Sequence, residues 1–113
     1  MKKNHLYILW TNENAITAEY MVMMYSENAI LKNWWDKVTV IVWGATSKMV
    51  AENSDIQRLI KQCQEAGVEF SGCIACAAKL GTIEKLTELG IELIRWGEPL
   101  TDLIKKGEHI LTV

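Results

Sequence analysis

The apolar residues of this chain gather in short runs that are separated by longer amphipathic stretches. The runs are rich in β-branched and aromatic residues and end near glycine or polar residues, which is typical of strands. We expect five strands, at residues 5–10, 38–44, 68–72, 91–97 and 109–113. The first is almost continuously apolar and should be covered on both faces, whereas the second should be central because of its β-branched content. The third alternates, so it should lie half exposed or near an edge.

Helical periodicity fills the stretches between these strands. The longest predicted helix spans residues 14–32 and has Thr11 or Asn12 available as a cap. One stripe of apolar residues would pack on the sheet, and the other is more apolar than solvent requires. A subunit contact would explain this second apolar stripe, and so would a wide core face with some exposed methionine. The first stripe comprises Ile16, Tyr20, Met23 and Leu31, and the second Ala18, Met21, Val22, Tyr25 and Ala29.

The middle of the chain carries clearer start and stop signals. Residues 45–53 look loop-like, with room for one helical turn. Ser54 and Gln57 have the spacing of a capping box for the following helix, which should end at Gly67. The apolar face of this helix includes Cys63, which we therefore expect to be a small core residue.

Strands that alternate with helices through short connections imply right-handed crossovers, and hence a parallel sheet with helices on both faces. Shorter helices that begin at Thr82 and near Pro99 complete the alternation. At 113 residues and without internal repeats, the chain should form a single domain, residues 1–113. Ligand sites in such sheets lie beyond the carboxyl ends of the strands.

Composition excludes several classes of partner. Half of the residues are apolar, 23% are charged and the net charge is −2, without a basic cluster, so nucleic acid is not expected as a partner. The apolar run from Leu6 to Trp10 is too short for a signal peptide. No run approaches the roughly 20 residues of a membrane span. We therefore expect a cytoplasmic protein without membrane contact.

The carboxyl ends of the predicted strands carry the residues of greatest interest. Trp10, Trp43 and Trp96 would give this edge of the sheet an apolar rim, and Cys73 ends the third strand. Cys73 and Cys76 form a C-x-x-C pair at the start of a helix, where free N–H groups and the helix dipole favour a thiolate. Residues three apart on a helix lie close enough for the two thiols to meet.

Four interpretations of the Cys73–Cys76 pair remain open at this stage. A structural zinc site needs four ligands, but Cys63, His5 and His109 are better explained as core or strand residues, so we expect no metal and no cofactor. A thioredoxin-type oxidoreductase is a second possibility, although the sole proline is poorly placed for that fold. The third is a sulfur carrier that forms a persulfide, and the fourth is two buried cysteines at a tight junction.

Several segments of the chain together resemble the DsrE/DsrF-like family, in order and over nearly the whole length. They are 40–44, 67–81, 89–101 and the closing Ile-Leu-Thr-Val. The most specific part is C-x-x-[AC]-A-x-x-x-G, which runs from Cys73 to Gly81. The resemblance implies a three-layer α/β/α sandwich with a five-stranded parallel sheet, in agreement with the pattern above.

The resemblance also implies a function. Characterised members of that family carry sulfur as a cysteine persulfide, in sulfur oxidation or in tRNA thiolation, and the reactive position corresponds to Cys73. Cys76 stands where several members have alanine. Members assemble as homotrimers, homohexamers or hetero-hexamers, so a homo-oligomer, trimer or hexamer, is expected here.

Our leading hypothesis is a small cytoplasmic sulfur-transfer protein, a persulfide carrier that exchanges sulfur with another protein as donor or acceptor. Cys73 would be the catalytic nucleophile and Cys76 a resolving or assisting thiol. The alternatives are a non-catalytic oligomeric binding module that uses the tryptophan-lined edge, and a dithiol–disulfide oxidoreductase that uses the C-x-x-C pair.

Overall fold

Five parallel strands form the single sheet of this protein, for which a computed structural model describes residues 4–113. The strands are β1 (His5–Trp10), β2 (Lys37–Val42), β3 (Glu69–Cys73), β4 (Glu92–Ile94) and β5 (His109–Thr112). They lie in the order β4-β3-β2-β1-β5, and all neighbours are parallel. The predicted three-layer α/β/α sandwich with a five-stranded parallel sheet is confirmed. So are the central position of β2 and the place of β3 next to an edge strand.

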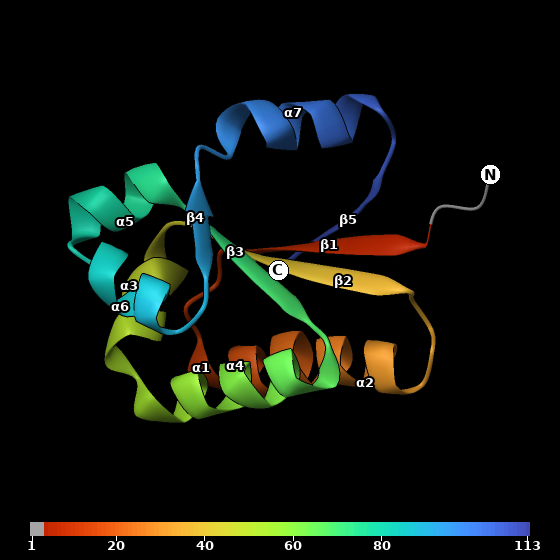
Figure 1. The fold of residues 1–113 in the computed structure, drawn as a ribbon, viewed down its shortest axis with the longest axis horizontal. Coiled ribbons are helices and arrows are strands. Elements are labelled where there is room, and N and C mark those ends of the chain that lie inside the picture. Colours follow the sequence, from red (N-terminus) through yellow and green to blue (C-terminus); the bar gives the residue numbers. More distant parts are fainter. Residues whose placement is uncertain (1–3) are drawn as a thin grey trace.

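The helices cover the two faces of the sheet unequally (Figure 1). They are α1 (Ala15–Thr17), η1 (Ala18–Met23), α2 (Met24–Leu31), α3 (Ala45–Glu52), α4 (Ser54–Ala66), α5 (Ile74–Leu80), α6 (Ile83–Glu88) and α7 (Gly97–Lys105). The first three and α4 line one face, α7 lies over the other, and α3, α5 and α6 pack together at one side. None of the helices in the described part of the chain is long and apolar enough to span a membrane.

The core lies between the sheet and the helices η1, α2 and α4. Alternate residues of the strands point to this side, and the buried set includes Leu6, Ile8, Trp10, Val38, Val40, Val42, Phe70, Val22, Met23, Ile56 and Ile60. The expectation that β1 is covered on both faces is wrong. Every second residue of β1 is only half-buried, because α7 has no buried residue and leaves that face of the sheet partly open.

The predicted helix at 14–32 is continuous from Ala15 to Leu31, but its middle, η1, is a π-helix. Because π-helical hydrogen bonds join residues five apart, the residues that follow are shifted around the helix axis. Met23, expected beside Tyr20, is therefore buried, and Met24 is exposed in its place. The exposed apolar stripe is Ile16, Tyr20, Met24 and Leu31.

Two helix caps differ from the sequence-based expectation by one to three residues. Asn14, not Thr11 or Asn12, caps α1 and accepts the backbone N–H of Thr17 at 3.0 Å. Asn53 caps α4 by accepting the Ile56 N–H at 3.1 Å, so Ser54 is already helical. In both helices an asparagine carboxamide, rather than the predicted side chain, accepts a free N–H of the first turn.

Residues 45–52 are helical rather than loop-like, because α3 begins directly after Gly44, and only Asn53 separates it from α4. Gly44 has φ 68° and ψ −128°, a conformation that glycine adopts readily and that turns the chain at once into a helix. Gln57 then donates to the carbonyls of Val50 and Ala51 at 2.9 and 3.1 Å. These bonds join the end of α3 to the start of α4.

Replacing Ile8 should show how much the single well-covered face contributes to stability. Ile8 has no exposed surface, so Ile8→Ala should lower the free energy of unfolding by about 2–5 kcal/mol. The matched control is Ile16→Ala at a residue that is 70% exposed, where the change should be below about 0.5 kcal/mol. Urea denaturation followed by circular dichroism measures both, and equal effects would contradict the assignment of the core.

Candidate functional site

Cys73 is the last residue of β3 and also the N-cap of α5. Its backbone is extended, with φ −78° and ψ 113°, and its Sγ accepts the backbone N–H of Cys76 at 3.4 Å. The structure thus places Cys73 at the predicted junction of strand and helix. The sulfur occupies the position in which N-cap side chains receive the free N–H groups of a helix.

Gly72 contributes to the site by leaving room between strands. A Cβ at this position would lie 2.9 Å from Leu93 Cδ2 and 3.5 Å from the Val42 carbonyl oxygen. Its φ is not positive, so the glycine favours the close approach of β4 rather than a turn, and a side chain here would make Leu93 move. This packing holds β3 in place immediately before Cys73.

Cys76 lies half-buried on the first turn of α5, beside Cys73. Burial raises its pKa, and a hydrogen bond with the Cys73 side chain raises it further. The Gly44 backbone partly offsets this increase in the pKa. Because Gly44 lies two residues beyond the end of β2, the carboxyl ends of two adjacent strands meet near this thiol. The raised pKa keeps the Cys76 thiol protonated at neutral pH.

The two cysteines of the pair are free thiols and differ in access. Cys73 is 7% exposed, whereas Cys76 is more open to solvent. Cys63 lies apart in the core, where its Sγ donates to the Met23 carbonyl at 3.4 Å. The prediction that Cys63 is a small core residue is confirmed.

The predicted tryptophan rim is wrong for two of its three members. Trp10 is completely buried, and its Nε1 donates to the Asn12 carbonyl at 3.0 Å. Trp96 is also buried, and its Nε1 donates to Ser71 Oγ at 2.9 Å. Only Trp43 remains half-buried at this edge. The alternation of β1 puts Trp10 on the core face, so its burial follows from the pleat.

The histidines considered as metal ligands lie away from the cysteine pair. His5 stacks on Tyr7 with ring centroids 4.0 Å apart, and His109 meets the edge of Trp35 at 5.2 Å. Within residues 4–113, no three His, Cys, Asp or Glu side chains gather in a way that could hold a metal ion.

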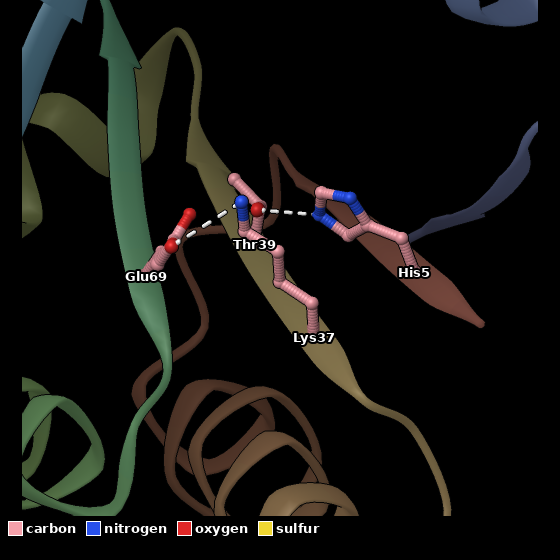
Figure 2. A network of polar contacts seen from close by, with 4 residues as sticks. All are labelled: His5, Lys37, Thr39 and Glu69. Atoms are coloured by element: carbon pink, nitrogen blue, oxygen red, sulfur yellow. Dashed lines mark hydrogen bonds and ion pairs between the residues drawn. The ribbon is translucent and has the colours of Figure 1, made fainter.

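A second polar cluster occupies the open face of the sheet (Figure 2). His5 Nε2 and Thr39 Oγ1 are 2.8 Å apart, and Lys37 Nζ lies 3.5 Å from a Glu69 carboxylate oxygen. These side chains border a cleft of about 730 Å³. Burial lowers the pKa of His5, and the charge of Lys37 lowers it further, so the imidazole is neutral at neutral pH.

This cluster was not predicted from the sequence, although the chain carries a signal for it. The signal is the recurrence of polar residues at alternate positions of three strands that are adjacent in the sheet. Register brings His5 opposite Lys37 and Thr39 opposite Glu69, so all four point to one side. The four groups satisfy one another, and the cluster is explained as the polar surface of a partly covered sheet.

Titration of Cys63 should make stability depend on alkaline pH. Burial raises its pKa from the ordinary 9.0 to about 11, so the folded state holds this proton more tightly than the unfolded state. The resulting stabilisation is complete below pH 9 and is lost as the pH rises through 11. Urea denaturation between these pH values should therefore show a smaller loss of stability in Cys63→Ala than in the native protein.

The control is Ile60→Val, which loosens the same core without removing a titratable group and should keep the native pH dependence. If the free energy of unfolding of Cys63→Ala falls with pH as steeply as that of the native protein, the assignment is contradicted.

Comparison with known proteins places the chain in a family. Neither a protein-family model nor a curated protein matches the sequence. A solved structure described as the conserved protein of unknown function BT1422 from Bacteroides thetaiotaomicron does match, with a TM-score of 0.95 and 35% sequence identity. The match covers 97% of this chain and 95% of that chain. The chain therefore belongs to the same family as this Bacteroides protein of unknown function.

Proposed function

We propose that this protein is a small sulfur carrier in which Cys73 holds a sulfane sulfur as a persulfide. The observation that carries the proposal is the position of the Cys73 sulfur, which accepts an N–H of α5 at 3.4 Å next to a second free thiol. An N–H at the start of a helix stabilises negative charge on its acceptor. The resemblance of residues 73–81 to the DsrE/DsrF-like motif supports the same role.

The transfer moves one sulfur atom without net oxidation. The Cys73 thiolate attacks the outer sulfur of a donor persulfide, R–S–SH, and a new S–S bond forms as the donor's S–S bond breaks. The R–S⁻ leaving group takes the bonding electron pair and becomes a thiol when it gains a proton. Attack by an acceptor thiolate on the outer sulfur of the Cys73 persulfide reverses these steps and unloads the carrier.

Cys76 assists by keeping its proton. Its raised pKa makes it a hydrogen-bond donor to the sulfur of Cys73 and a proton source for the leaving thiolate. The same protonation slows attack by Cys76 on the loaded Cys73, which would form a Cys73–Cys76 disulfide and release the cargo as sulfide. The low exposure of Cys73 further shields the bound sulfur from oxidants in solution.

Dithiol–disulfide exchange is a second candidate, favoured by the proximity of the same two thiols. It needs an external disulfide as oxidant, with two electrons passing from the dithiol to that disulfide. The raised pKa of Cys76 disfavours the thiolate that would close the Cys73–Cys76 bond. Sulfur transfer, which uses Cys76 in its protonated form, is therefore the better supported function.

Assembly into a homo-oligomer, a trimer or hexamer, and exchange with a protein donor or acceptor form part of the proposal. The exposed stripe of Ile16, Tyr20, Met24 and Leu31 supports a subunit contact, because contiguous exposed apolar surface marks interaction sites. A cytoplasmic location is also proposed, since thiols there remain reduced and all three cysteines are free.

The persulfide is tested by intact mass after incubation with glutathione persulfide. The native protein and Cys63→Ser should each gain the mass of one sulfur atom, and Cys73→Ser should gain none. Cys76→Ser should still be loaded, but more slowly, because it retains the nucleophile and loses the proton donor. An adduct that persists in Cys73→Ser would refute the assignment, and loss of two hydrogens in place of sulfur gain would favour dithiol exchange.

The subunit contact is tested by sedimentation velocity. Ile16→Glu puts a charge into the exposed stripe and should shift the native trimer or hexamer to smaller species. Ile104→Glu is the matched control on α7, because Ile104 is similarly exposed, at 62%, but lies outside the stripe. A native protein that sediments as a monomer, or an equal effect of both substitutions, would contradict the predicted interface.

A further inference from the structure

A pocket of about 510 Å³ lies between α5, α6 and β4. Six of its seven lining residues are apolar, and the seventh is Arg95. The lining residues are Ile74, Ala75, Ala78, Ile83, Leu93, Ile94 and Arg95. The volume falls within the range of roughly 300–1,000 Å³ that is usual for small-molecule sites.

The pocket borders the cysteine site. Ile74 follows Cys73 in the chain, and Ile94 is the residue of β4 that pairs with Cys73 in the sheet. Ligand sites of parallel α/β sheets lie at this end of the strands. The pocket is therefore placed where a molecule that approaches Cys73 would have its body recognised.

Arg95 is a free cation at the rim of this apolar surface. Its side chain is exposed and forms no ion pair with any residue between 4 and 113. A guanidinium stays charged and can bind a carboxylate through two parallel hydrogen bonds. The neighbouring Ile83 is 41% exposed, so an apolar ligand body would gain by covering it.

We propose that this pocket binds a small organic anion with an aliphatic or aromatic body. The body covers the apolar wall formed by α5 and α6, and the anionic group pairs with Arg95. Its use as the recognition site for the organic persulfide or thiol that exchanges sulfur with Cys73 rests on the proposed function. Binding of the anion itself does not depend on that function.

The test is a titration of the full-length protein with octanoate, followed by NMR shifts of backbone amides in α5, α6 and β4. We expect saturable binding, about tenfold weaker in Arg95→Gln, because one charge-assisted pair is lost. Ala78→Phe, at an exposed helix position, should abolish binding by filling the pocket. Lys79→Gln removes a positive charge at the residue after Ala78, which does not line the pocket, and should bind like the native protein.

Three results would overturn the proposal. They are absence of saturable octanoate binding, equal affinity for the uncharged octanamide, and native affinity in both Arg95→Gln and Ala78→Phe. Cys73→Ser separates this proposal from sulfur transfer, because it should lose persulfide formation and still bind octanoate. If the native protein forms the persulfide but does not bind octanoate, the pocket alone is refuted. If it binds octanoate but forms no persulfide, the carrier function alone is refuted.

Discussion

Parallel pairing of β2 with β3 is the constraint on which the cysteine site depends. The register places Val42 beside Gly72, so the two strands end side by side and α3 and α5 begin at the same edge. This arrangement brings the Gly44 backbone to the Cys76 sulfur, although the two residues are far apart in the chain. It also favours glycine at position 72, where a side chain would displace the Leu93 side chain. Local C-x-x-C spacing brings the two thiols together, and sheet geometry adds the Gly44 backbone to them.

The unequal covering of the sheet divides the molecule into a stabilising side and an open side. The face toward η1, α2 and α4 holds the continuous apolar core, and α7 lies over the opposite face (Figure 1). That opposite face carries charged and hydroxyl side chains (Figure 2). Purely parallel sheets are usually buried on both faces. The polar side chains of the open face bond to one another, which lowers the cost of leaving that face partly uncovered.

The chemistry of the cysteine pair follows from small differences in environment between neighbouring sulfurs. Cys73 receives a helix N–H and is shielded, whereas Cys76 is more open but is kept protonated by burial and by Cys73 itself. This division suits a reaction in which one sulfur attacks and the other supplies a proton. In the proposed function, the adjacent apolar pocket with Arg95 would select the molecule that approaches.

Local patterns in the chain were sufficient to predict the five strands, the parallel α/β/α architecture, the end of α4 at Gly67 and the place of Cys73. These features depend on periodicity and on turn chemistry within a few residues. The π-helical shift that exposes Met24, the burial of Trp96 and the packing role of Gly72 could not be predicted in this way. The polar cluster on the open face and the Arg95 pocket also join residues from separate elements. Each of these depends on how distant segments pair and pack, which a local pattern does not encode until the strand order and register are known.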